Sequence, residues 1–262
     1  MTTELIFEDE LPGSIRVGRI VYEGGKSVHP SYPGYTPILV LTRSSPYGSL
    51  GPYVLKNEKG QLMENVWQFS KLYPWVPAAR QTYSRWDSRV IWEHPQETHI
   101  DKNGRPNDKY WAWREKGLYN DEAVRYPVGN TSHRKLCMGC IKEGDETQTL
   151  LPLADARREI YLYEYCRLVK KQPQYRELKQ RLAQGENLLI IEIDGPHEES
   201  LDYYREVYDV DDTFIESRTM LASYKNLNLM LYDSCHSFGH GYALCIALRD
   251  WENDFERPLY AI

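Results

Sequence analysis

The amino-acid sequence predicts an α+β fold, a mainly helical single domain with a small β-sheet. Residues 15–42 alternate apolar and polar positions between glycine and proline turns, a pattern typical of short strands. Residues 154–185 carry apolar side chains at helical spacing, in two segments of which Pro173 begins the second. Residues 187–195, NLLIIEIDG, run from apolar residues into alternating acids, as a buried strand does where it ends at a polar loop.

Three other segments indicate helices. Residues 63–72, MENVWQFSKL, place Val66 and Phe69 in a helix-length window before a proline stop. Residues 196–224 are charged and indicate helix. Residues 237–251, SFGHGYALCIALRDW, indicate a glycine-rich turn that leads into an apolar helix at the end of the chain.

The middle of the chain lacks a clean period. Residues 75–144 are dense in Trp, Pro, His and charged residues. A structureless loop of that length would be exceptional, so we expect it to contain short helices and its own packing. Since 262 residues fit one domain, we interpret 75–153 as an insertion within a single domain over residues 1–262.

Composition limits the classes of function. Asp and Glu outnumber Lys and Arg by 38 to 32, and a net charge of −6 argues against non-specific binding of a phosphate backbone. The start of the chain, MTTELIFEDELPG, has acids where a signal peptide is basic, and no stretch approaches the roughly 20 apolar residues of a membrane span. Five scattered cysteines fit a reducing compartment. We therefore expect a soluble, cytoplasmic protein without a membrane partner.

Aromatic residues are abundant and mostly polar-edged. The chain has 21 Tyr and 7 Trp but only 5 Phe. Such a set suits a pocket that stacks flat rings, and it equally suits a rigid core whose aromatic edges make hydrogen bonds.

Three segments, in chain order, carry a family resemblance. The first contains Tyr47, Gly48, Ser49, Leu50, Gly51, Pro52, Tyr53, Glu64, Trp67, Gln68, Phe69 and Lys71. The second is the helix pair of residues 154–185 with the strand that ends near Glu192, and the third is Asp233 with Phe238, Gly239, His240, Gly241 and the last helix. These segments, about half the chain, resemble the NADAR family, whose members hydrolyse N-glycosidic bonds in ADP-ribose-related or riboflavin-pathway nucleotides. Met63 stands where the family has Ser, Phe238 where it has Trp, and the Asn usual after the glycines is missing.

The resemblance implies a NADAR-like fold and an N-glycosidase. Cleavage of a ribose–base bond passes through an oxocarbenium-like state, which needs a carboxylate near the sugar and an acid or base for water and leaving group. The carboxylates that the resemblance selects as catalytic are Glu64, Glu192 and Asp233. The implied substrate is a small-molecule nucleotide or an ADP-ribosylated nucleic-acid base, such as ADP-ribosylated guanine or a ribosylamino-pyrimidine phosphate, and neither metal nor cofactor is expected.

Each of these positions also has a simpler interpretation. Partial burial against Trp67 would suit Glu64 to proton transfer, but a first-turn Glu also favours the helix dipole. Glu192 and Asp194, two apart on a strand, would share one face of a pocket, or they are solvated loop acids. Gly239 and Gly241 would let backbone N–H groups approach a phosphate, or they form an ordinary turn.

The remaining nominations concern substrate binding. Arginine and lysine hold phosphates, and aromatic residues hold the base. The predicted substrate-binding residues are Tyr47, Gly48, Trp67, Lys71, Arg125, Arg158, Asp194, Phe238, Gly239 and Gly241.

Rival functions come from other residues. His133, Cys137 and Cys140, with Cys166, Cys235 or His236 as a fourth ligand, approximate the spacing of a structural zinc site and would make the chain a zinc-stabilised interaction protein. His94 and His99 would be metal ligands or catalytic bases, although Pro95 breaks helical spacing between them. A further alternative is a non-catalytic nucleotide or ADP-ribose binding module that uses the same aromatic pocket.

Overall fold

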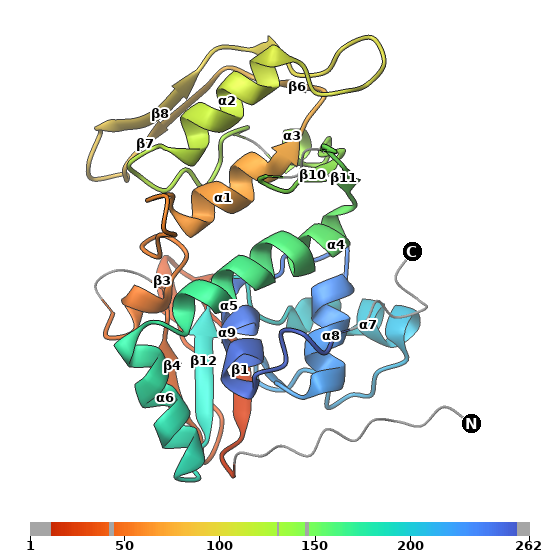
Figure 1. Ribbon diagram of the computed structural model, residues 1–262. Helices are drawn as coiled ribbons and strands as arrows, with labels where there is room; N and C mark the ends of the chain where they lie inside the picture. The colour runs from red at the N-terminus through yellow and green to blue at the C-terminus, as the bar shows by residue number, and fades with distance from the viewer. Residues whose placement is uncertain (1–11, 42–44, 130, 145–146, 256–262) are drawn as a thin grey trace. The chain divides into compact units, whose positions relative to one another are not determined.

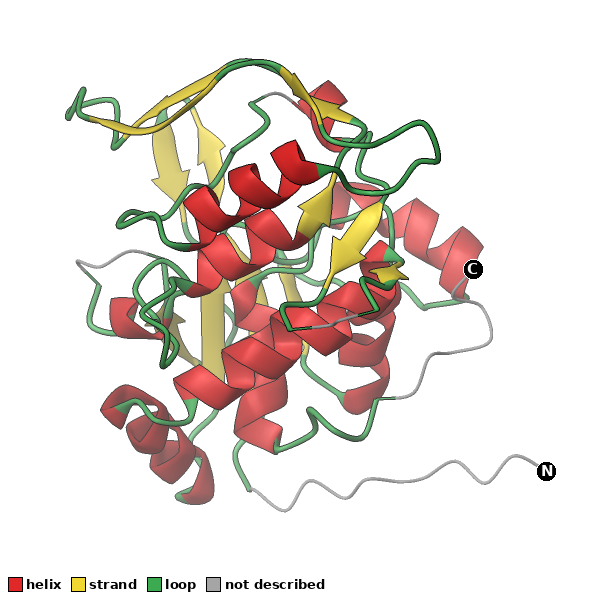
Figure 2. Cartoon of the chain, turned by 45° about the horizontal axis from the view of Figure 1, so that its top comes forward, coloured by secondary structure: helices red, strands yellow, loops and turns green. Residues whose placement is uncertain are grey.

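The computed structural model describes residues 12–41, 45–129, 131–144 and 147–255, and it has an α+β fold (Figure 1). The chain divides into two compact units. Unit 1 comprises residues 1–51 and 165–262, and unit 2 comprises residues 52–164. The α+β class is confirmed. Instead of one small sheet, however, the described residues form a four-stranded sheet, a three-stranded sheet and three two-stranded ribbons, drawn in yellow in Figure 2.

Unit 1 is built on the four-stranded sheet, in the order β13-β1-β12-β4. Its strands are β1 (Ile15–Arg19), β4 (Thr36–Leu39), β12 (Leu188–Glu192) and β13 (Thr219–Leu221). The central strand β12 is parallel to both neighbours, and its Ile190 pairs with Val17 on one side and Ile38 on the other. All five β12 residues are buried, which explains the unbroken apolar run of the sequence.

Five helices of the described residues also belong wholly or partly to unit 1. They are α5 (Tyr163–Val169), which begins in unit 2, α6 (Pro173–Ala183), α7 (Leu201–Tyr208), α8 (Tyr224–Tyr232) and α9 (His240–Arg249). The unit also has two short helical turns, Gly48–Leu50 (η1) and Glu198–Ser200 (η3). A hairpin is formed by β2 (Val21–Glu23) and β3 (Lys26–Val28). Every residue of α9 is buried, and the helix contacts β1, β12, α6 and α8 (Figure 1). A helix that is apolar around its whole circumference belongs in the middle of a core.

The helices expected after residue 153 are confirmed, with one correction downstream. Pro173 is the first residue of α6, and Gly185 follows the helix with a φ of +86°. Residues 196–224 were expected to be helical throughout, but residues 219–221 form β13, which pairs with the edge of β1. The buried Thr219 accepts a 2.8 Å hydrogen bond from the Arg16 side chain, so tertiary contacts decide this segment.

Unit 2 combines short helices with short strands. Its helices are α1 (Met63–Ser70), α2 (Asp108–Leu118), α3 (Thr131–Arg134) and α4 (Leu153–Ala156), which continues into the π-helical turn Arg157–Leu162 (η2). Its strands are β5 (Lys71–Leu72), β6 (Trp75–Val76), β7 (Ala79–Thr82), β8 (Val90–His94), β9 (Glu97–Thr98), β10 (Gly139–Ile141) and β11 (Leu150–Leu151), arranged as β11-β10-β5, β6-β9 and β7-β8. The predicted helix over 63–72 thus ends at Ser70, and the next two residues begin a strand.

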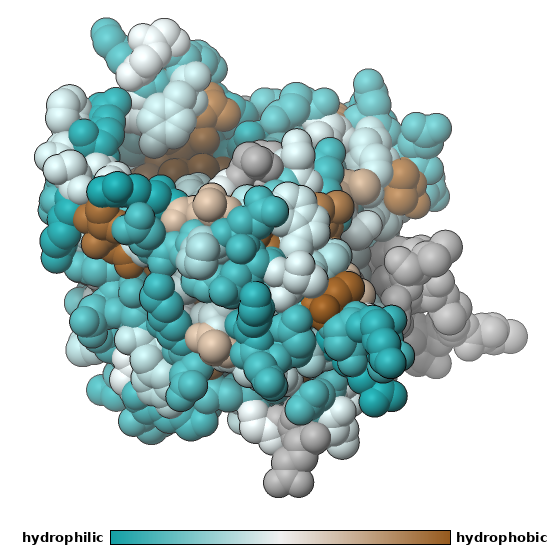
Figure 3. All heavy atoms as spheres, turned by 90° about the horizontal axis from the view of Figure 1, so that it is seen from above, coloured by the Kyte–Doolittle hydropathy of each residue, from teal (hydrophilic) through white to brown (hydrophobic). Residues whose placement is uncertain are grey.

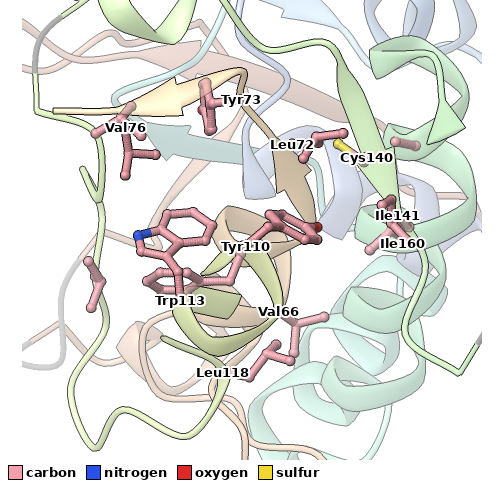
Figure 4. Close-up of a cluster of buried hydrophobic side chains, with 14 of the residues drawn as sticks. Val66, Leu72, Tyr73, Val76, Tyr110, Trp113, Leu118, Cys140, Ile141 and Ile160 are labelled. Carbon is pink, nitrogen blue, oxygen red and sulfur yellow. The ribbon is translucent and has the colours of Figure 1, made fainter. Parts of the chain in front are cut away.

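An aromatic cluster forms the core of unit 2. Phe69 packs between Trp92 and Trp113, with ring centroids 4.8 and 4.6 Å away. Figure 4 shows Trp113 and Tyr110 of α2 within this cluster, together with apolar side chains of α1, β5 and β10. The ring of Phe69 lies directly over Gly117. The expectation that the aperiodic middle of the chain has its own packing is therefore confirmed.

The surface carries hydrophobic residues in separate places. On the face seen in Figure 3, brown hydrophobic patches are divided by teal hydrophilic side chains. The large exposed aromatics include Trp86 and Tyr22, which lie far apart in the sequence. Within the described ranges, no helix combines the length and the apolar character needed to cross a membrane.

Candidate functional site

The three carboxylates selected from the sequence are all buried, in two different units. Glu64 of unit 2 is 6% exposed, whereas Glu192 and Asp233 of unit 1 are 1% and 0% exposed. A buried carboxylate is stable only when hydrogen bonds or opposite charges compensate for the lost hydration. The partners of each therefore indicate what it does.

Glu64 begins a chain of polar contacts along one face of α1. Its Oε1 accepts a 2.9 Å hydrogen bond from Gln68, and the Oε1 of Gln68 accepts a 2.9 Å hydrogen bond from the Lys71 ammonium. Glu64 and Gln68 are four positions apart on α1, which places them on the same side of the helix, and Lys71 follows directly after it as the first residue of β5. Together with Trp67 and Tyr161 we call this set the Glu64 network.

The aromatic members of the Glu64 network complete its surroundings. The Lys71 ammonium lies 4.6 Å from the centroid of the Trp67 ring, and that ring meets Tyr161 edge-on at 5.3 Å. Burial lowers the pKa of Lys71, against the opposing influence of Cys140, Cys137 and Glu64.

Glu192 closes the end of β12 against the start of α9. Its Oε2 lies 3.0 Å from His240 Nδ1, and its Oε1 accepts a 2.8 Å hydrogen bond from the Gly241 N–H. The other ring nitrogen of His240 lies 2.6 Å from the Val40 carbonyl. Burial alone would lower the pKa of His240, but the Glu192 carboxylate and this carbonyl raise it above its usual value.

The two glycines at the start of α9 make this contact possible. A Cβ at Gly239 would overlap the Glu192 carboxylate, and one at Gly241 would also press on it. The sequence suggested that these N–H groups approach a phosphate; in the structure the anion at this helix start is Glu192 itself. Phe238, just before them, is buried and stacked on Tyr242 at 5.5 Å.

Asp194 lies outside β12. The strand ends at Glu192, and Asp194 lies exposed in the bend that follows, so the period of two within a strand does not apply to it. Its charge nevertheless contributes to the raised pKa of His240.

Asp233 follows α8 and collects four hydrogen-bond donors. Its Oδ1 accepts from the hydroxyls of Tyr203 and Tyr208, at 2.8 and 3.1 Å, and from the Cys235 N–H at 3.1 Å. Its Oδ2 lies 2.6 Å from His236 Nδ1. Burial alone would raise the pKa of Asp233, but these hydrogen bonds outweigh it and lower the pKa below its usual value. No sequence pattern marks the two tyrosines, and His236 is predicted only as a zinc ligand.

Tyr47 and Gly48 lie in unit 1, where they attach a loop to α6. The Tyr47 hydroxyl donates to Glu177 and accepts from Arg181, both at 2.7 Å. Gly48 is buried and begins η1. The Tyr47 hydroxyl thus joins this loop to α6.

The two arginines nominated for phosphate binding have neighbours of their own in unit 2. The Arg125 guanidinium lies 3.9 Å from the centroid of the Tyr53 ring. Arg158 forms a 3.3 Å ion pair with Glu159. Neither residue is joined to the Glu64 network by a contact described above.

The rival metal sites are not assembled in the described part of the chain. There, no group of three or more His, Cys, Asp or Glu side chains is placed to hold a metal ion. His133 Nε2 lies 2.7 Å from the Trp75 carbonyl instead, and His94 pairs with Glu97. His99 is fully buried within the aromatic core, next to Trp113.

Two carboxylate-centred sites therefore stand out, the Glu64 network in unit 2 and the Asp233–His236 pair in unit 1. Comparisons of the chain with protein-family models, curated proteins and solved structures found no match. Its function is accordingly argued from the chemistry of these side chains.

Proposed function

We propose that the protein hydrolyses the N-glycosidic bond of a nucleotide-like substrate and that Glu64 is the essential carboxylate. The substrate class is that of ADP-ribosylated guanine or a ribosylamino-pyrimidine phosphate. The observation that supports this proposal is the chain of contacts from Glu64 through Gln68 to Lys71, with a half-buried Trp67 ring beside it.

The Glu64 carboxylate suits the charge that the reaction develops. As the bond between ribose and base breaks, positive charge accumulates on the sugar, and a fixed carboxylate stabilises it more strongly where water is excluded. Glu64 can also accept the proton of the attacking water. The hydrogen bond from Gln68 holds the carboxylate in one orientation, which is what such a role requires.

Lys71 and the aromatic rings suit the rest of the substrate. The Lys71 ammonium can bind a phosphate as a point charge. Because its pKa is lowered, the ammonium is also a better proton donor to a departing base. The half-buried Trp67 ring, which Tyr161 supports edge-on, is an aromatic group of the kind on which a base can stack.

Turnover of a defined panel tests the proposal. The full chain is incubated with ADP-ribosylated guanosine, ADP-ribosylated DNA and ribosylamino-pyrimidine phosphates, and released base is measured by mass spectrometry. We expect release from at least one substrate and a loss of about 100-fold or more in Glu64→Gln. Glu115→Gln, an exposed Glu on α2 of the same unit, is the matched control.

Two results would count against it. A fully active Glu64→Gln protein would remove Glu64 from the mechanism. Measurable binding without release of base from any substrate would instead support a non-catalytic nucleotide-binding module.

A further inference from the structure

We propose that unit 1 contains a second catalytic site, in which Ser200, His236 and Asp233 form a nucleophile–base–carboxylate triad that hydrolyses small esters. His236 Nε2 lies 2.9 Å from Ser200 Oγ, and His236 Nδ1 lies 2.6 Å from Asp233 Oδ2. A hydroxyl and a carboxylate on opposite nitrogens of one imidazole define such a triad by geometry, whatever the order of the residues in the chain. This activity is independent of the Glu64 network.

Asp233 is held in the state that the triad requires. Three donors, Tyr203, Tyr208 and the Cys235 N–H, occupy its Oδ1 and leave Oδ2 to the imidazole. Because hydrogen bonding lowers the pKa of Asp233, the carboxylate is ionised at neutral pH and accepts from the Nδ1–H of His236. That tautomer leaves the lone pair of Nε2 directed at the Ser200 hydroxyl.

Aromatic rings fix the orientation of the imidazole. The ring centroids of Tyr203, Tyr204 and His197 lie 5.2, 4.9 and 5.0 Å from that of His236. The His236 side chain is only 13% exposed. A general base that is held this way loses little entropy when it reacts.

Ser200 lies at the start of α7, where a serine hydroxyl usually binds the backbone of the helix. It is the N-cap residue of α7, a position at which serine usually accepts from a backbone N–H of the first turn. Ser200 makes no such capping bond, and its Oγ faces His236 instead. Ser223, the N-cap of α8, has an extended backbone and accepts from the Asn226 N–H, whereas Ser200 ends the helical turn η3 and does not have an extended backbone.

A cleft of about 370 Å³ borders the segment that leads to Ser200, and Glu198 and Glu199 are among its lining residues. The triad residues Ser200, His236 and Asp233 do not line this cleft. The ester is therefore bound at the half-buried Ser200 hydroxyl itself, and a small acyl group suits that position best.

The reaction balances without a cofactor. The Ser200 oxygen bonds to the ester carbonyl carbon while its proton passes to His236 Nε2. The ester C–O bond breaks, and the alcohol leaves with that proton, so the acyl group stays on Ser200. Water then attacks this acyl group, with His236 taking and returning a proton. Carboxylic acid is released and the serine hydroxyl is restored.

Covalent labelling and turnover test the triad. The full chain is treated with a fluorophosphonate probe, which reacts with activated serines, and p-nitrophenyl acetate hydrolysis is followed in parallel. We expect the probe on Ser200 by peptide mapping, and a loss of about 100-fold or more in ester turnover for Ser200→Ala and His236→Gln. Ser234→Ala, an exposed serine beside Asp233, should label and turn over as the unmodified chain does.

The positioning role of Asp233 needs its own measurement. A proton shared between Asp233 and His236 Nδ1 should give a far-downfield imidazole N–H signal in the proton NMR spectrum, present in Ser200→Ala and absent in Asp233→Asn. Near-UV circular dichroism confirms that each variant is folded. A folded chain that the probe does not label at Ser200, or a Ser200→Ala protein that hydrolyses the ester at the original rate, would overturn the proposal and leave the serine–histidine contact as a structural hydrogen bond.

Discussion

Glu192 and His240 form a buried ion pair that joins the central strand of unit 1 to its central helix, with Oε2 3.0 Å from Nδ1. The Gly241 N–H and the Val40 carbonyl bind the outer atoms of the pair, so its hydrogen-bonding groups are matched. Since both residues are within elements of the core, the pair fixes how β12 and α9 meet.

Removing the charge of Glu192 should therefore destabilise unit 1. Glu192→Gln leaves the His240 charge buried without its counter-ion, and breaking a buried pair costs about 3–5 kcal/mol. Urea unfolding followed by far-UV circular dichroism measures the change in the free energy of unfolding. Glu206→Gln, an exposed Glu on α7 of the same unit, is the control and should change it by less than about 0.5 kcal/mol. Equal free energies of unfolding in the two variants would mean that the Glu192–His240 pair does not contribute to the stability of unit 1.

The pH dependence of this pair has a definite sign. The folded state raises the pKa of His240, so its stabilising contribution is complete below the usual pKa of histidine, about 6.5, and is lost as the pH rises through the higher folded value. Unfolding free energies between pH 6 and pH 9 should show this decline, and His240→Gln should flatten it. If the free energy of unfolding of His240→Gln declines by the same amount, another group causes the decline.

His99 predicts the opposite trend for unit 2. Burial in the aromatic core lowers its pKa to about 4, and neither ring nitrogen has a hydrogen-bond partner among the described residues. Between pH 6.5 and 4 the unfolded chain takes up a proton that the folded chain refuses, which costs about 3 kcal/mol. Tryptophan fluorescence during urea unfolding at pH 7 and pH 5 should show about 2 kcal/mol of this loss. In His99→Phe the acid-induced loss should shrink, and an unchanged loss would exclude His99 as its source.

Substitution of Gly117 by alanine has two opposing effects on stability, one through helix propensity and one through side-chain packing. Alanine is favoured over glycine within a helix by about 1 kcal/mol, but a Cβ at residue 117 would overlap the Phe69 ring, and overpacking costs about 1–3 kcal/mol. We expect overpacking to prevail, so that Gly117→Ala lowers the free energy of unfolding of unit 2. In a Phe69→Leu background, where the ring is gone, Gly117→Ala should be less harmful. An alanine equally harmful in both backgrounds would exclude the clash with Phe69.

Cys137 should be an unusually reactive thiol. A hydrogen bond with Cys140 and the nearby Lys71 ammonium outweigh burial and lower the pKa of Cys137 to about 7. Its alkylation rate by iodoacetamide, measured by peptide mass spectrometry, should therefore rise through a midpoint near pH 7. Lys71→Met should move that midpoint upward, whereas Lys142→Met, which removes an exposed charge, should not. Identical midpoints in both variants would exclude Lys71 as a cause.

Several elements follow from the sequence because their causes are local. The apolar run of β12 predicts a buried strand, Pro173 and Gly185 delimit α6, and the glycine-rich turn predicts the start of α9. In each case a period or a residue with restricted dihedral angles acts within a few positions, so neighbours in the chain are sufficient.

The two candidate sites also differ in whether local sequence or tertiary packing brings their residues together. Glu64 and Gln68 are four positions apart, so a helix prediction places them together, and Lys71 reaches Gln68 from the residue directly after the helix. Ser200 and His236 are separated by 36 positions and meet only because α7 and the turn after α8 pack together. No local pattern marks that contact.

The sequence by itself thus determined the α+β class, the buried central strand and helix of unit 1, and the helix α1, since these depend on periodicity within single elements. The tertiary structure alone decided that residues 219–221 form a strand on the edge of β1, that Glu192 rather than a phosphate meets the start of α9, and that Asp233 binds His236. Pairing across a sheet and compensation of a buried charge depend on groups distant in the chain, and their free energy exceeds the local preference of any short segment.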